Sequence, residues 1–155
     1  GFLAEESGRT AGDEFTWMTT LIFSGRFDSL PMIADFVRMS AQEAGLSSFQ
    51  IYAVETAVDE ACANIIEHAY GGEGKGDIEC SCTITKKGLT IILRDTGRPF
   101  NPKNIKNPDL NSSLEERSDH GLGLYFIRQW MDDVDFEFKP GSNTLTMSKF
   151  KEKQS

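Results

Sequence analysis

The sequence predicts an α+β fold, a two-layer sandwich whose mixed or antiparallel sheet is covered on one face by helices. Two observations support this class. At 77–95 and 134–150, runs of alternating apolar and polar residues that are rich in β-branched side chains predict hairpins. Segments with helical patterns lie before and between these hairpins. The chain of 155 residues, of which 39% are hydrophobic, is also of a size that folds around a single core. We expect this domain to span 15–150, with tails at 1–14 and 151–155.

In the first half of the chain we expect one strand and two helices. Residues 15–27 are rich in aromatic and β-branched residues, which favours a strand. Residues 29–45 begin with serine, carry proline in the first turn and end in glycine, the signals that bound a helix. A second helix should start at a cap formed by Ser47 or Ser48 and end near Tyr70.

In the second half we expect two hairpins separated by an irregular segment and a helix. The hairpin at 77–95 turns at a Lys-Lys-Gly sequence, the strongest hairpin signal in the chain. Residues 96–121 are rich in proline and asparagine and have no periodicity, which is typical of a functional or disordered segment. A third helix at 121–133 begins on two glycines, and the hairpin at 134–150 closes the domain.

The charge of the chain excludes some classes of partner. Sixteen basic and 24 acidic residues give a formal charge of −8 and a pI near 4.8. Such a chain has no general attraction for nucleic acid or anionic lipid, so we expect neither direct nucleic-acid binding nor membrane association. No apolar run approaches the roughly 20 residues that span a bilayer, and the first residues lack the features of a secretion signal.

The three cysteines are interpreted as buried, reduced thiols. Cys80 and Cys82 alternate along a strand and point to the same face, and no further metal ligands are grouped near them or near Cys62. A cytoplasmic location fits this interpretation, since thiols stay reduced there.

The second helix carries an unusual polar edge. In "VDEACANIIEHAYGG" (58–72), Glu60, Asn64 and His68 are spaced four residues apart. At the helical repeat they fall within roughly 80° of one another, separate from the apolar stripe. Taken alone, this edge is a solvated helix surface in most proteins.

Two further motifs hold candidate binding residues. In "RDTGRPF" (94–100), Asp95 directly follows an apolar strand and Gly97 comes two residues later, which by itself describes an ordinary turn. In "HGLGLYFIRQ" (120–129), Gly121 and Gly123 open a helix. Bare amides at a helix start make a natural phosphate cradle, although close helix packing also explains such glycines.

The order of these motifs resembles the Bergerat-fold ATP-binding domains, the GHKL superfamily of gyrase, heat-shock chaperones, histidine kinases and mismatch-repair ATPases. The nearest likeness is to the bacterial anti-sigma factor serine kinases. "VDEACANIIEHAYGG" is similar to their N box, "DTGRPFNP" to their first glycine box and "GLGLYFIRQWMDDVDFE" to their second. "NTLTM" (143–147) resembles their closing Thr-bearing strand, although Asn143 stands where glycine usually precedes the threonine. The resemblance covers roughly 15–150.

For catalysis, the resemblance implies ATP and Mg²⁺ as cofactors. Asn64 would ligate the Mg²⁺ that bridges the ATP phosphates, a suitable role for a hard amide oxygen. Glu60, one turn earlier, would act as general base toward an incoming hydroxyl. For His68, fixing the helix end is a better interpretation than a catalytic role.

For nucleotide binding, the resemblance implies five residues. Asp95 would accept a hydrogen bond from the adenine amino group, Gly97 would let the backbone approach the base, and Thr144 would support Asp95 from the neighbouring strand. Gly121 and Gly123 would open the phosphate-facing helix, and the loop before them would serve as a lid over the nucleotide.

The function implied by the resemblance is an ATP-binding anti-sigma factor with serine/threonine protein kinase activity. It would phosphorylate a serine on an anti-anti-sigma partner and sequester a sigma factor, and it would pair as a homodimer. Alternatives are an ATP-dependent protein-binding switch without kinase activity, a detached histidine-kinase catalytic domain, and a structural protein without a nucleotide site. Retention of Glu60 argues against the switch, since binding alone needs no base. No segment supplies the phosphoacceptor helix that a histidine kinase requires.

Overall fold

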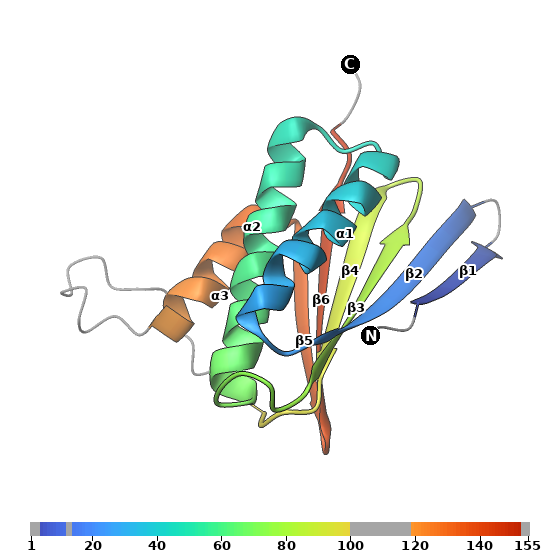
Figure 1. Ribbon diagram of the computed structural model, residues 1–155. Coiled ribbons are helices and arrows are strands. Elements are labelled where there is room, and N and C mark those ends of the chain that lie inside the picture. The colour runs from blue at the N-terminus through green and yellow to red at the C-terminus, as the bar shows by residue number, and fades with distance from the viewer. Residues whose placement is uncertain (1–3, 12–13, 100–118, 153–155) are drawn as a thin grey trace, which may run out of the picture.

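The computed structural model describes residues 4–11, 14–99 and 119–152, with side chains described in 16–99 and 125–152 (Figure 1). The strands are β1 (Ala4–Ala11), β2 (Glu14–Ser24), β3 (Asp77–Ile84), β4 (Gly88–Asp95), β5 (Asp133–Lys139) and β6 (Ser142–Phe150). The helices are the short η1 (Phe27–Ser29), α1 (Leu30–Glu43), α2 (Ser48–Asn64), the π-helix η2 (Ile65–Ala69) and α3 (Asp119–Trp130).

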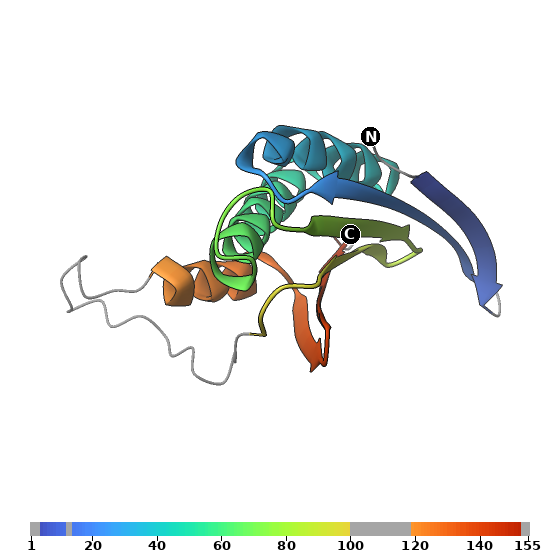
Figure 2. The same ribbon diagram turned by 60° about the horizontal axis from the view of Figure 1, so that its bottom comes forward.

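The strands form one six-stranded sheet in the order β1-β2-β3-β4-β6-β5, and every neighbouring pair is antiparallel. Figures 1 and 2 show α1, α2 and α3 on one side of this sheet, and no helix of the described chain on the other. The predicted α+β class, with helices on one face, is therefore confirmed, and the sheet is antiparallel rather than mixed.

The strand β1 corrects the interpretation of residues 1–14 as a tail. Ala4–Ala11 pairs along its whole length with β2 at the edge of the sheet. Its sequence, AEESGRTA, holds no aromatic residue and only one β-branched residue, Thr10, so the pattern did not reveal it. Backbone pairing to β2 defines this strand.

Each of the two long helices shows an expected signal at one end, whereas Ser29 precedes α1 without a side-chain capping hydrogen bond. After α1, the amides of Gly45 and Leu46 donate to the carbonyls of Gln42 and Ala41, the paired bonds of a Schellman motif, and Gly45 has φ +82°. At α2, Ser47 and Gln50 form a reciprocal capping box, which settles the cap between the two candidate serines.

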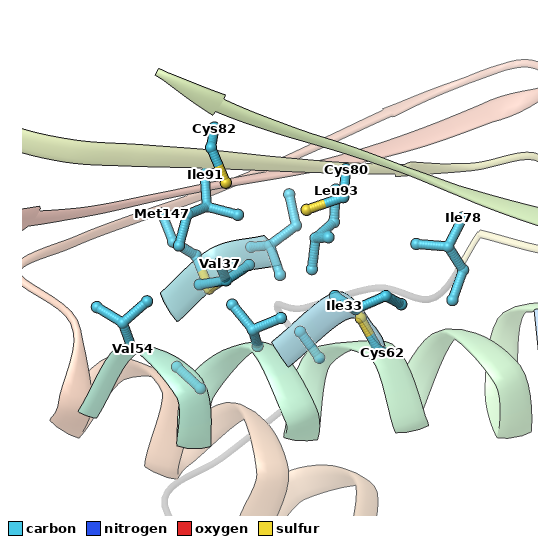
Figure 3. Packing of buried hydrophobic residues seen from close by; sticks show 14 of the residues in the cluster. Ile33, Val37, Val54, Cys62, Ile78, Cys80, Cys82, Ile91, Leu93 and Met147 are labelled. Atoms are coloured by element: carbon cyan, nitrogen blue, oxygen red, sulfur yellow. The ribbon is translucent and has the colours of Figure 1, made fainter. Parts of the chain in front are cut away.

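The core lies between the helices and the sheet (Figure 3). It includes Ile33 and Val37 of α1, Val54 and Cys62 of α2, and residues of the central strands β3, β4 and β6: Ile78, Cys80, Cys82, Ile91, Leu93 and Met147. The three cysteines are unpaired and buried, as expected, and burial raises the pKa of the Cys62 thiol far above its ordinary value. Among the described residues no helix is both long and apolar enough to cross a membrane.

We expect Ser47→Ala to lower the free energy of unfolding by about 0.5–2 kcal/mol, because the first turn of α2 loses its capping acceptor. Urea denaturation followed by circular dichroism measures this change. Ser48→Ala, at the exposed neighbouring position inside the helix, is the matched control and should change stability by less than about 0.5 kcal/mol. Equal effects of the two substitutions would contradict the cap.

Candidate functional site

The helix that carries Asn64 changes type immediately after it. The α-helical hydrogen bonds end at Asn64, and η2 follows with the wider spacing in which the amide of Tyr70 donates to the carbonyl of Ile65 at 2.9 Å. The single helix expected to run to about Tyr70 is thus α2 followed by one π-helical turn. Such turns are rare and occur frequently at functional sites.

The loop after β4 is attached to this helix end. The amide of Arg98 donates to the carbonyl of Ala69 at 2.7 Å, and its guanidinium donates to the carbonyl of His68 at 3.2 Å. The hydroxyl of Tyr70 accepts from the amide of Thr96 at 3.0 Å. These bonds hold the strand-end motif and the end of the polar helix together, although they are 26 or more residues apart in sequence.

Gly97 lies where the loop touches the helix. A Cβ at this position would stand 2.5 Å from the carbonyl oxygen of Ala69, a distance that side chains do not tolerate. We expected Gly97 to let the backbone approach the adenine base. The structure gives the glycine a packing role that holds without any ligand.

Asp95 is the buried carboxylate of the site. It is 3% exposed at the end of β4, and its Oδ1 accepts from the amide of Gly97 at 2.9 Å and from Nδ2 of Asn143 at 2.8 Å. Burial raises the pKa of Asp95 above its ordinary value, and the two hydrogen bonds offset part of that rise. Both of these bonds go to Oδ1, and no bond to Oδ2 is seen among the described residues.

The residue that supports Asp95 from the neighbouring strand is Asn143, not Thr144 as expected. The register pairs Asp95 with Asn143 and Arg94 with Thr144. Along β6 the buried positions alternate, with Asn143, Leu145 and Met147 turned toward the helices. The alternation of "NTLTM", with apolar residues at 145 and 147, is the sequence signal that could have indicated Asn143 as the inward residue.

These residues line one narrow pocket between α2, α3 and the ends of β4, β5 and β6. It is lined by Ala61, Asn64, Ile65, Asp95, Ile127, Phe136, Phe138, Asn143, Thr144 and Leu145. The cavity has a volume of about 20 Å³, room for little more than one water molecule, so a purine base enters only if wall side chains shift. Sequence reasoning did not identify the apolar wall, in which the rings of Phe136 and Phe138 stack with centroids 6.1 Å apart.

Asn64 fits a ligand-binding role. Its side chain is 6% exposed, and its Nδ2 has no hydrogen-bond partner among the described residues. Because Nδ2 is a donor, burying it without a partner costs about 1–3 kcal/mol, which an acceptor such as a phosphate oxygen would recover. A metal ion would bind the Oδ1 of the same amide instead. The described residues contain no group of three or more His, Cys, Asp or Glu side chains that could hold a metal. A magnesium ion would therefore depend on this amide and on phosphate oxygens, the usual arrangement for Mg²⁺ at phosphates.

The other predicted site residues lie around this pocket rather than in its lining. Glu60 is half-buried one turn before Asn64. The carboxylate of Glu67 lies 3.8 Å from Nε2 of His68. The backbone carbonyl of His68 accepts the hydrogen bond from Arg98 described above. The expected lid falls in 100–118, outside the described residues.

The glycine motif lies inside α3 rather than before it. The helix begins at Asp119, so the amide of Gly121 is among the first unpaired N–H groups and that of Gly123 follows them. The predicted helix, 121–133, therefore begins two residues and ends three residues earlier than expected. Ile127 of this helix lines the pocket.

Comparison with known proteins defines the class. Residues 23–149 match the family model of the histidine kinase-like ATPase domain, and the chain belongs to this family. Among its relatives are serine-protein kinases RsbW. That of Bacillus cereus (strain ATCC 10987 / NRS 248) is 33% identical over 114 residues, 71% of this chain and 70% of the relative. That of Bacillus mycoides (strain KBAB4) is 32% identical over the same shares. The resemblance inferred from the motifs is confirmed.

We expect Gly97→Ala to destabilise the protein by about 1–3 kcal/mol in the absence of nucleotide, because the added methyl group would overlap the Ala69 carbonyl. Thermal or urea unfolding without ATP measures this. Arg94→Ala, at an exposed position of the same strand, is the control. Wild-type stability of the Gly97→Ala protein would mean that this contact does not constrain the fold.

The buried Asp95 predicts a pH dependence of stability. Because its pKa is higher in the folded state than its ordinary value of 3.8, the folded state binds more protons than the unfolded state between the two values. This group therefore destabilises the fold increasingly as pH rises through that window, whereas an asparagine would not. Urea unfolding at pH 4 to 7 should show wild type losing stability relative to Asp95→Asn. A difference that is independent of pH would contradict the prediction.

Proposed function

We propose that this chain is an ATP-dependent serine/threonine protein kinase that acts as an anti-sigma factor. It phosphorylates a serine on an anti-anti-sigma partner and sequesters a sigma factor. The observation that carries the proposal is one pocket that combines the buried carboxylate of Asp95 with the unpartnered amide of Asn64. Relatives named as serine-protein kinases support it.

In this proposal Asp95 binds the base and Asn64 binds the metal. Asp95 accepts from the adenine amino group through the oxygen that Gly97 and Asn143 do not occupy. Asn64 offers its amide oxygen to Mg²⁺, which when bound neutralises phosphate charge. The N–H groups at the start of α3, with Gly121 and Gly123 in its first turns, face the phosphates.

Glu60 is the proposed general base. It lies one turn before Asn64 on the same helix. The proposed base and the proposed metal ligand are therefore about 6 Å apart along the helix axis. Glu60 accepts the proton of the serine hydroxyl as that oxygen attacks the γ-phosphate. Phosphoryl transfer requires little else beyond positioning and charge stabilisation.

The same proposal includes a homodimer and a cytoplasmic location. Buried, unpaired cysteines support a reducing compartment. The net charge of −8 supports protein partners over nucleic acid. Gel filtration with light scattering measures the dimer, and a monomer at micromolar concentration would remove it from the proposal.

The alternative function is a protein-binding switch that holds ATP without transferring phosphate. One observation favours it, since Glu60 stands outside the pocket lining. Incubation with radiolabelled ATP and a candidate anti-anti-sigma protein separates the two functions. Label on the partner establishes the kinase, and ATP binding without label on any partner establishes the switch.

Two substitutions on α2 should separate chemistry from binding. Glu60→Gln keeps the size of the side chain but cannot accept the proton, so it should bind ATP normally and lower transfer about 10²–10⁴-fold. Asn64→Ala removes a metal ligand and should weaken Mg²⁺-dependent ATP binding as well as transfer. Calorimetry and phosphorylation assays measure the two effects.

Glu67→Gln is the matched control for these substitutions. Glu67 is an exposed acid on the neighbouring π-helical turn, and its side chain is 50% exposed. The control should bind ATP and transfer phosphate as wild type does. Transfer at the wild-type rate by Glu60→Gln would exclude Glu60 as the base.

A further inference from the structure

The side chain of Asn143 contains a buried acceptor that the account above does not use. Asn143 is 4% exposed and lines the pocket, and its Oδ1 has no hydrogen-bond partner among the described residues. A buried acceptor left in this state destabilises the folded protein. The bonds that Asn143 makes to Asp95 and to the loop after β4 use only the Nδ2 end of its amide, so they give the Oδ1 end no function.

The orientation of the Asn143 amide follows from its contacts. Its Nδ2 reaches three acceptors, Oδ1 of Asp95 at 2.8 Å and the carbonyl oxygens of Gly97 at 3.3 Å and Arg98 at 3.0 Å. The reversed amide would place an oxygen against three oxygens. The network therefore requires Nδ2 on the side of the loop, which leaves Oδ1 as the group that lacks a partner.

Two acceptors thus stand next to each other in the pocket. Asp95 has one oxygen occupied by Gly97 and Asn143 and a second oxygen left over, and Asn143 has its own Oδ1. The two side chains are directly opposed in the register of β4 and β6 and are linked by a hydrogen bond. The chemical group that complements this pair has two N–H donors on one nitrogen, and an aromatic amino group fits that description.

We infer that Asn143 is a second base-reading residue, whose Oδ1 accepts one hydrogen of the adenine 6-amino group while Asp95 accepts the other. This inference rests on the proposed ATP-binding function and adds a specificity element to it. A 6-oxo purine would bring a carbonyl oxygen against both acceptors and leave them unpaired. Asn143 therefore helps the site to select 6-amino over 6-oxo purine nucleotides.

The test is a binding cycle that requires no catalysis. Calorimetry gives the Kd of ATP and of purine riboside triphosphate, which has hydrogen in place of the amino group, for wild type and Asn143→Leu. Wild type should prefer ATP about 10²-fold, the worth of two hydrogen bonds of roughly 1–1.5 kcal/mol each. In Asn143→Leu that preference should fall about tenfold, whether or not the overall affinity for both nucleotides also drops. Thr146→Val, a polar-to-apolar change on the opposite face of β6, should keep the wild-type preference.

The outcomes separate this inference from the proposed function. An unchanged preference in Asn143→Leu, even with weaker overall binding, would show that Asn143 only positions Asp95 and would overturn the inference while ATP binding stands. Wild type that binds no ATP would overturn both. If Asn143→Leu does not fold, N6-methyl-ATP on wild type decides the matter. Its Kd should rise about tenfold or more because one of two bonded hydrogens is replaced, and an unchanged Kd would overturn the inference.

Discussion

The hydrogen bond from Asn143 to Asp95 is the interaction on which the site depends. It joins residues 48 positions apart at the ends of two central strands, where the chain leaves the sheet beneath α2. A carboxylate that is 3% exposed has lost most of its contact with water, so hydrogen-bond donors must offset the cost of burying its charge. The amides of Asn143 and Gly97 are these donors. Because Oδ1 takes both bonds, the carboxylate presents its other oxygen to the pocket in a defined direction.

A second set of contacts fixes the loop of Asp95 against the helix of Asn64. Arg98 and Thr96 bond to the helix end, and Gly97 permits the contact because it lacks a side chain. The α-helical spacing changes to π at Ile65, and the loop contacts His68, Ala69 and Tyr70, which follow this change. A shift of the helix end would therefore move Asp95 and Asn64 together, and such coupling keeps the two side chains in a fixed relative position.

The site also shows how an acidic chain accommodates a polyanion. The net charge of −8 opposes a nucleotide at long range, and screening limits that effect beyond about 8–10 Å. Within the pocket the described groups are mostly apolar, with one buried carboxylate and two amides. The overall charge therefore bears mainly on which large partners approach.

The sequence alone determined the features that depend on neighbours along the chain. The caps at Ser47 and Gly45, the hairpins on either side of the irregular segment and the polar edge of α2 all follow from spacings of two to four residues. Only the tertiary structure decided that Asn143 rather than Thr144 faces Asp95, that Ala4–Ala11 joins the sheet, and that Gly97 packs on Ala69. Each of these depends on strand pairing or on contact between segments distant in sequence. Local patterns indicate at most which face a residue occupies, as the alternation in "NTLTM" does for Asn143. They do not indicate its partner, because partners are selected by the register of the sheet and the packing of the helices on it.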